Sequence, residues 1–263
     1  IEKTGELLFE KSKIGSDDAI NRYNNSLDNW ERTKGYNIVE KEELVSIASY
    51  YDTTINILNY LLQLNHETGL NRKKENERFL TESGINFDDD NKRVALKYIF
   101  VNSNAMLIYG AAGTGKTTLI KYISNMFVDA RKLYLTKTHT ALQNVKRYLD
   151  NKSNNCDFEI IDSITRSNLS VNYDIIFVDE CSTIDNRTMA LLLGKISREV
   201  LLVMSGDIYQ IESIDFGNWF FYAKDIVKTK GASVELGHTW RTDKEELKSL
   251  WTAVRKKSSI ITE

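Results

Sequence analysis

The pattern of hydrophobic positions changes near residue 104 of the 263-residue chain. Downstream of that point, short apolar runs alternate with segments whose apolar residues recur at helical spacing, over residues 117–126, 140–149 and 186–197. Uninterrupted apolar runs of this length predict strands that are buried on both faces. Their alternation with helices indicates an α/β fold with a parallel sheet. The predicted strands cover residues 105–110, 132–137, 158–162, 174–180, 199–207 and 232–236.

The first 90 residues have a different texture, because they are rich in Asn, Lys and Glu and carry apolar residues at helical spacing. This pattern predicts a small, mostly helical region over residues 1–85, followed by a second domain with the α/β pattern over residues 86–263. The polar stretch 67–82 indicates a linker or an exposed helix, and the acids at 88–90 precede a further amphipathic helix. The helical spacing rests on Leu44, Ile47, Ala48, Tyr51, Ile55, Leu58, Leu61 and Leu62.

Composition narrows the class of protein only modestly. The chain has 35 Lys and Arg against 37 Asp and Glu, so any contact with nucleic acid must be local rather than the work of a global basic field. No apolar run approaches the roughly 20 residues of a membrane span. Two cysteines and three histidines without ligand-like spacing argue against disulfides and structural zinc, which favours a cytoplasmic protein. The chain begins with Ile1, which is compatible with a piece of a longer protein.

The strongest chemical signal is GAAGTGKTT, which fits the phosphate-binding loop G-x-x-x-x-G-K-[ST] and lies between a predicted strand and a predicted helix. Its glycines allow successive backbone N–H groups to face one anion at the start of the helix. Lys116 is expected to reach the β and γ phosphates of ATP, and Thr117 to bind Mg²⁺. A simple glycine-rich turn is the alternative. The candidate nucleotide contacts of the loop are Gly110, Gly113, Thr114, Gly115, Lys116, Thr117 and Thr118.

Polar residues also follow two other predicted strands. Asp179 and Glu180 end the run DIIFVDE, where Asp179 suits the magnesium site and Glu180 suits the general base that activates water. Gln210 follows the run that ends in Gly206 and Asp207, and it could bind the γ phosphate or the attacking water. The alternatives are a strand that exits into a polar turn and an ordinary loop aspartate.

A further cluster lies in LGHTWRTDKEEL, where Thr242 and Glu245 form a capping box that starts a helix. The fixed helix start would hold Arg241 as a second cation for the transferring phosphoryl group and Trp240 as a surface for adenine. A core tryptophan beside a solvated arginine is the alternative.

In their order along residues 88–255, these elements resemble the RecD-like branch of the superfamily one helicases. The matching motifs are GAAGTGKTT, TKTHTALQNV, VDECSTID, GDIYQIESIDFG and HTWRT. The resemblance implies a RecA-like P-loop NTPase lobe that uses ATP and Mg²⁺ and contacts single-stranded DNA. It assigns ATPase roles to Lys116, Thr117, Asp179, Glu180, Gln210 and Arg241, DNA contacts to Thr138, His139, Thr140 and Ser163, and base stacking to Trp240.

The chain departs from the family pattern in two places. Asn91 is the nearest match to the adenine-reading glutamine that the family carries upstream of its phosphate loop. The chain also ends soon after Lys257, so the second RecA-like lobe is expected in the same longer chain or in another chain. Basic and aromatic residues could add phosphate contacts and base stacking for a single strand. These are Lys137, His139, Lys146, Arg147, Trp219, Phe220 and Phe221.

The sequence therefore predicts the ATP-binding and ATP-hydrolysing motor lobe of a DNA helicase, which translocates along single-stranded DNA once its second lobe is present. Three alternatives keep the phosphate loop. A nucleotide-dependent switch or assembly ATPase would not need Gln210 and Trp240 in position. A small-molecule kinase would need an acceptor pocket and an arginine-rich lid, of which the sequence gives no sign. A non-catalytic scaffold would not be expected to keep Lys116, Thr117, Asp179 and Glu180 together.

Overall fold

The centre of the molecule is a six-stranded parallel sheet with the strand order β6-β5-β7-β8-β4-β9. The computed structural model describes residues 7–13, 17–64, 70–87, 90–149, 155–167, 171–208, 217–228 and 232–237. Each predicted apolar run overlaps one strand, although β6 begins two residues before its predicted run, so the α/β fold with a parallel sheet is confirmed. The strands are β4 (Ala105–Gly110), β5 (Lys132–Thr136), β6 (Cys156–Ile160), β7 (Ile175–Val178), β8 (Leu201–Gly206) and β9 (Ser233–Leu236).

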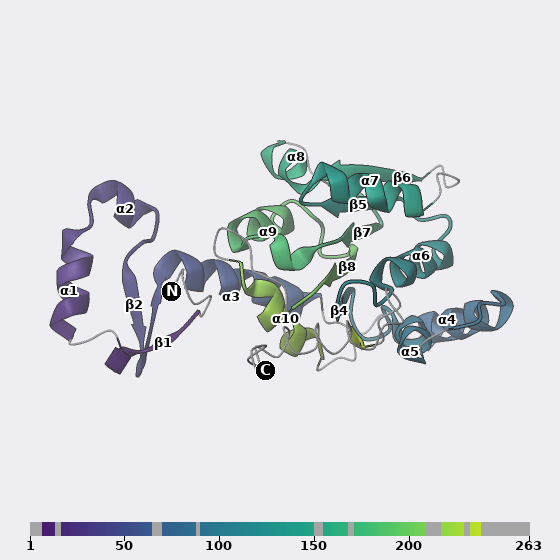
Figure 1. Cartoon of the computed structure of the whole chain (residues 1–263), viewed down its shortest axis with the longest axis horizontal. Helices are drawn as coiled ribbons and strands as arrows, with labels where there is room; N and C mark the ends of the chain where they lie inside the picture. Colours follow the sequence, from purple (N-terminus) through teal and green to yellow (C-terminus); the bar gives the residue numbers. More distant parts are fainter. Residues whose placement is uncertain are drawn as a thin grey trace, which may run out of the picture.

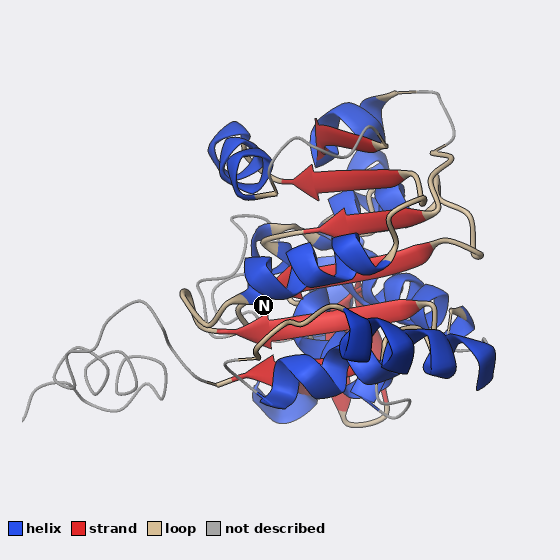
Figure 2. Cartoon of the chain, turned by 90° about the vertical axis from the view of Figure 1, so that its right-hand side faces the viewer, coloured by secondary structure: helices blue, strands red, loops and turns tan. Residues whose placement is uncertain are grey.

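Helices cover both faces of this sheet (Figure 2). Side chains of one strand therefore enter two separate cores: in β4, Leu107 joins the core under α3, α9 and α10, while Met106 and Ile108 join the core under α5 and α6. This double burial explains why the strands are apolar throughout instead of alternating. The helices of this part are α5 (Asp90–Tyr98), α6 (Lys116–Met126), α7 (His139–Tyr148), α8 (Ile161–Arg166), α9 (Asn186–Leu193) and α10 (Trp219–Lys228).

The strand order determines which loops meet at the carboxyl edge of the sheet. β8 lies between β4, which leads into the phosphate loop, and β7, which leads into the acidic pair. This is the RecA-like arrangement that the sequence predicts. Because all the strands are parallel, the loops after β4, β7 and β8 lie at the same edge, where ligands of such sheets bind.

The N-terminal region contains helices, as predicted, but it also forms a small antiparallel sheet with the order β1-β3-β2 (Figure 1). The helical assignment of Leu44 and Ile47 is wrong, because both lie in β3 and the helix begins only at Ala48. A two-residue turn joins β2 to β3 and places Glu42 at a φ of 55°. Glycine or asparagine usually fills such a turn, so the sequence carries no hairpin signal here. The elements are β1 (Phe9–Glu10), the short 3-10 helix η1 (Lys11–Lys13), α1 (Asp17–Ser26), α2 (Asn29–Thr33), β2 (Ile38–Lys41), β3 (Leu44–Ile47), α3 (Ala48–Gln63) and α4 (Leu70–Glu82).

Helix α3 connects this small sheet to the central one (Figure 1). Its residues Ile57 and Leu61 are buried in the same core as α9 and α10. The Tyr60 hydroxyl lies 3.2 Å from the carbonyl oxygen of Ile196 and 3.1 Å from that of Ser197, and can donate a hydrogen bond to either. The predicted domain boundary near residue 85 stays a prediction, but α3, which precedes it, packs as part of the ATPase lobe.

Candidate nucleotide-binding site

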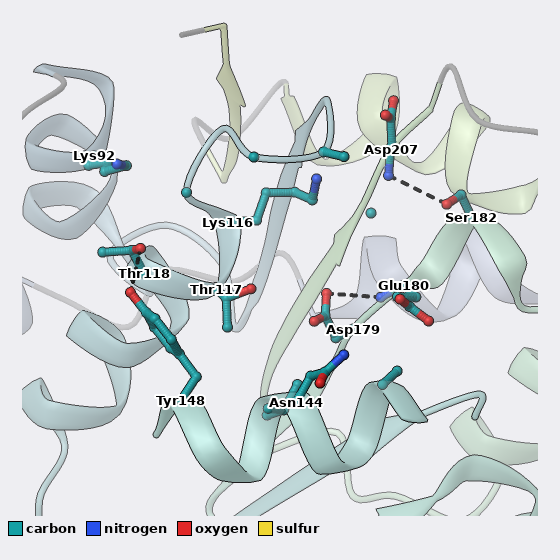
Figure 3. A pocket seen from close by; sticks show the side chains of 16 residues that line it. Lys92, Lys116, Thr117, Thr118, Asn144, Tyr148, Asp179, Glu180, Ser182 and Asp207 are labelled. Atoms are coloured by element: carbon teal, nitrogen blue, oxygen red, sulfur yellow. Dashed lines mark hydrogen bonds between the residues drawn. The ribbon is translucent and has the colours of Figure 1, made fainter. Parts of the chain in front are cut away.

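A pocket of about 750 Å³ lies at the carboxyl edge of the central sheet, where the loops after β4, β7 and β8 meet (Figure 3). Figure 3 shows Lys116, Thr117 and Asp179 turned toward the same space. The side chains around that space come from four parts of the fold: α5, the phosphate loop with α6, α7, and the ends of β7 and β8. The lining residues are Lys92, Ala112, Gly113, Gly115, Lys116, Thr117, Thr118, Ala141, Asn144, Val145, Tyr148, Asp179, Glu180, Ser182, Gly206 and Asp207.

Two glycines give the phosphate loop its shape. Gly115, the N-cap of α6, has a φ of 86°, a conformation that other residues rarely adopt. At Gly110, an added Cβ would lie 2.4 Å from the carbonyl oxygen of Leu236, so only glycine fits between β4 and β9. Gly110 and Thr114 are not among the lining residues. Thr114 is buried, and its hydroxyl donates to the carbonyl of Ala111 at 2.9 Å, which stabilises the loop from within.

The Lys116 side chain folds back over the start of the loop. Its ammonium group donates hydrogen bonds to the carbonyl oxygens of Gly110, at 2.7 Å, and Ala111, at 2.9 Å. Lys116 begins α6, so its charge adds to the positive end of the helix dipole beside the pocket. The loop therefore combines an ammonium group with the N-terminus of an 11-residue helix, an arrangement suited to an anion.

The acidic pair lies across the pocket from the loop. The Asp179 carboxylate accepts hydrogen bonds from the Ser205 hydroxyl and from the backbone N–H of Glu180, the latter at 2.9 Å. Glu180 itself has a φ of 57°, a strained conformation for a residue other than glycine. Desolvation, and then the negative charge of Asp179, raise the pKa of Glu180, while the Lys116 ammonium opposes them.

Asp207 is a lining residue that the sequence analysis did not select, although it noted the Gly206-Asp207 pair. Asp207 follows β8, is 6% exposed, and its backbone N–H donates to the Ser182 hydroxyl at 3.4 Å. Gly206 is closely packed, because a Cβ there would lie 2.8 Å from the ring of Phe220. A polar residue after a buried strand was the available signal. From the sequence alone, this signal cannot be distinguished from an ordinary turn, because the strand ends that lie beside Asp207 become known only in the folded chain.

Helix α5 contributes Lys92 instead of the expected Asn91. Asn91 is exposed and is not among the lining residues, so its role in adenine binding stays a prediction without structural support. Lys92 lines the pocket and is only 1% exposed. The sequence gave no reason to choose it, because a lysine in an amphipathic helix is usually solvated.

Helix α7 forms the wall opposite the loop. Its residues Ala141, Asn144, Val145 and Tyr148 have the spacing of one helical face and all line the pocket. The Tyr148 hydroxyl lies 2.8 Å from the hydroxyl of Thr118, which joins α7 to α6. This contact links the wall formed by α7 to α6, the helix that follows the phosphate loop.

The predicted DNA contacts lie at the same edge of the sheet, after β5 and β6. Thr138 is the N-cap of α7, and its hydroxyl accepts a hydrogen bond from the N–H of Ala141 at 3.2 Å. His139 and Thr140 are exposed. Ser163 on α8 is exposed too, although its hydroxyl lies 2.9 Å from the Glu159 carboxylate. These residues are accessible, and their contact with DNA stays a prediction.

The additional aromatic and basic candidates divide into two groups. Trp219 and Phe220 cannot stack on bases, because they are 0% and 1% exposed and belong to the core. Phe221 is 45% exposed.

Among the basic candidates, Lys137 lies 3.4 Å from the Asp185 carboxylate and 3.6 Å from that of Asp162, so its charge is largely neutralised by the protein. Lys146 and Arg147 are exposed on α7. Gln210, Trp240 and Arg241 lie outside the described residues.

The chain belongs to the AAA domain family AAA_30, which matches residues 89–260. This membership, together with the similarity to a RecD subunit described next, confirms the predicted resemblance to the RecD-like superfamily one helicases. The matched segment includes the phosphate loop, the acidic pair and the predicted DNA contacts.

Two curated proteins and one solved structure are similar to this chain. An uncharacterized protein of Methanocaldococcus jannaschii is 26% identical over 84% of this chain and 21% of its own length. The RecD subunit of the RecBCD enzyme of Buchnera aphidicola is 22% identical over 72% of this chain and 36% of its own length. A structure of Pif1 helicases at forked DNA aligns with 67% of this chain and 50% of that chain, at 14% identity and a TM-score of 0.48. The chain thus spans about a fifth to a third of the two curated relatives.

Two further expectations concern the environment of the protein. Within the described ranges, no helix has the length and apolar character that crossing a membrane requires. Cys156 and Cys181 are both free thiols, consistent with their predicted lack of a disulfide. The cytoplasmic location stays a prediction.

Proposed function

We propose that this chain is the ATP-binding and ATP-hydrolysing motor lobe of a RecD-like helicase. With its second RecA-like lobe, in the same longer chain or in another, it couples hydrolysis of Mg-ATP to movement along single-stranded DNA. The observation that carries the proposal is the convergence of Lys116, Thr117, Asp179 and Glu180 on one pocket at the end of β4, β7 and β8. A switch or an assembly ATPase would share this pocket, and the DNA experiment below separates the two.

The phosphate loop supplies the binding energy for the triphosphate. The first backbone N–H groups of a helix have no partner within it, and the residues that begin α6 line the pocket. The Lys116 ammonium is already held above the loop. The hydrogen bonds from the Lys116 ammonium to the two loop carbonyls can be exchanged for bonds to phosphate oxygens, in which the acceptor is charged as well as the donor.

Thr117 and Asp179 are the residues that would hold Mg²⁺. Both line the pocket, and both offer oxygen atoms, which Mg²⁺ prefers. Mg²⁺ is usually held by one or two protein oxygens together with oxygens of phosphate and water. When bound, the ion offsets charge that develops on the phosphate oxygens.

Glu180 is the proposed general base. Its carboxyl lies beside Asp179 at the carboxyl edge of the sheet, and its raised pKa brings it closer to the range in which it can take a proton from water. The Ser205 hydroxyl donates to the Asp179 carboxylate and so fixes the residue that would hold the ion beside the base.

The Glu180→Gln substitution tests the enzymatic part of the proposal. We expect the rate of ATP hydrolysis to fall about 100-fold or more, with Mg-ADP affinity nearly unchanged. Glu199→Gln is the matched control, because Glu199 is exposed and precedes β8 at the opposite edge of the sheet. Removing a carboxylate whose charged form is disfavoured should leave the melting temperature unchanged or higher. Full hydrolysis by Glu180→Gln would refute the assignment of the base.

The DNA part of the proposal is tested by ATPase rates with and without a single-stranded oligonucleotide. In the presence of the second RecA-like lobe, we expect stimulation by DNA that weakens in His139→Ala, since His139 is exposed beside the Thr138 cap of α7. Hydrolysis that single-stranded DNA does not change would favour a switch or assembly ATPase.

A further inference from the structure

We propose that Lys92 is a second phosphate-binding cation of this site, which contacts the α phosphate of the bound nucleotide. The inference rests on the proposed function, because it assigns a ligand within the same pocket. Lys92 lies on α5, 24 positions before Lys116 and outside the phosphate loop. The motif therefore gives it no role.

The position of the Lys92 ammonium is well defined by the loop that it approaches. A Cβ added to Gly115 would lie 2.6 Å from Nζ and 3.0 Å from Cε of Lys92. The same position is 3.8 Å from the hydroxyl oxygen of Thr118. The ammonium group thus packs against the last residue of the loop, beside the first turn of α6. Gly115 is required there both by its φ of 86° and by the approach of this side chain.

The two lysines occupy opposite ends of the phosphate loop. Lys116 Nζ binds the carbonyls of Gly110 and Ala111 at the start of the loop, whereas Lys92 Nζ lies against Gly115 at its end. Figure 3 shows Lys92 on a separate helix to one side of the loop and Lys116 at the centre of the pocket. A phosphate chain lying along the loop with its γ phosphate at Lys116 would therefore have its α phosphate at Lys92.

The charge at this end of the loop is complementary to an anion. Lys92 lines the pocket, and its ammonium group lies at the N-terminus of α6, where the helix dipole is also positive. A phosphate group would be attracted by both charges at once. Its oxygens are acceptors, and an ammonium group offers three donors and no acceptor.

Lys92 also has contacts within the protein, so a contribution to folding must be measured separately. Lys97 provides the matched control on the same helix. Its ammonium group pairs with the Glu77 carboxylate at 3.1 Å, it keeps 39% of its side-chain surface exposed, and it does not line the pocket. Lys→Met at either position keeps the apolar stem and removes the charge.

The experiment compares Lys92→Met, Lys92→Arg and Lys97→Met with the wild-type chain. Affinities for Mg-ADP and for a non-hydrolysable Mg-ATP analogue are measured by calorimetry, and melting temperatures are measured without nucleotide. Loss of a charge-assisted hydrogen bond should weaken binding of both nucleotides by roughly 10- to 100-fold in Lys92→Met. Because both nucleotides contain the α phosphate, the ratio of the two affinities should stay at its wild-type value. Lys92→Arg should recover part of the loss.

Three results would overturn the inference. Affinities of Lys92→Met within twofold of those of Lys97→Met would show that Lys92 contacts no phosphate, and an accompanying fall in melting temperature would make it a structural residue. A loss confined to the ATP analogue would place Lys92 at the γ phosphate instead. Failure of the wild-type chain to bind either nucleotide would refute the proposed function itself, before any Lys92 variant is compared.

Discussion

The central sheet and the small N-terminal sheet are built on different physical principles. The strands β4, β7 and β8 are buried on both faces, so their carboxyl ends are held by two cores at once. The N-terminal strands are two to four residues long, and β2 has no buried residue. Side chains that carry chemistry follow the first kind of strand. The comparison teaches that strand ends held between two cores position the site. The residues that line the pocket come from parts of the chain outside the N-terminal sheet.

The largest effect is expected from a test of whether α3, the helix that joins the two regions, belongs to the core of the central sheet. Leu61 is 0% exposed in the core of the ATPase lobe, so Leu61→Ala should lower the free energy of unfolding by about 3 kcal/mol in urea denaturation. Leu62→Ala is the control, because Leu62 is the next residue of the helix and is 45% exposed. Equal, small effects of the two substitutions would show that α3 does not belong to the lobe.

A smaller effect is expected at the start of α9, near the functional edge of the sheet. The Asp185 carboxylate accepts hydrogen bonds from the backbone N–H and the hydroxyl of Thr188, both at 2.7 Å. Asp185→Ala should therefore lower the free energy of unfolding at pH 7 by about 1–2 kcal/mol. Asp52→Ala, at an exposed position of α3, serves as the control.

The lowered pKa of Asp185 determines how the destabilisation by Asp185→Ala changes with pH. Burial of Asp185 acts to raise its pKa, but the bonds from Thr188 and the charge of Lys137 outweigh it and lower the pKa. The stabilisation is thus present above the ordinary pKa of aspartate and is lost as the pH falls through the lowered value. The difference between the wild type and Asp185→Ala should shrink on acidification. A difference that grows in acid would contradict this account of the cap.

The smallest effect is expected in the N-terminal region. Lys11 pairs with Asp17 at 2.8 Å and with Glu40 at 2.5 Å, and hydrogen bonds to these two carboxylates raise its pKa. Because these groups are near the surface and screened by salt, Lys11→Met should leave the urea midpoint unchanged within error at 0.15 M salt. Lys13→Met, whose pair with Glu10 is longer at 3.6 Å, is the control. A clear destabilisation by Lys11→Met alone would show that ion pairs, and not packing, hold the small sheet.

The same contrast explains what could be predicted from the sequence. The central strands could be predicted because runs such as the one around Phe177 are apolar where both faces of the sheet are covered. The phosphate loop could be predicted because the residues after Tyr109 follow a strict motif. The β2–β3 hairpin was missed because Glu42 occupies a position that usually shows glycine. Lys92 was missed because only the folded chain brings α5 against Gly115. Trp219 was misassigned because sequence does not distinguish an aromatic core residue from a stacking platform.

The most direct test of the central claim is a crystal structure of the chain with Mg²⁺ and a non-hydrolysable ATP analogue. The account predicts phosphates along the loop from Gly110 to Thr118, the ion between Thr117 and Asp179, and Glu180 facing the γ phosphate. A nucleotide bound elsewhere, or an ion that neither Thr117 nor Asp179 approaches, would contradict it.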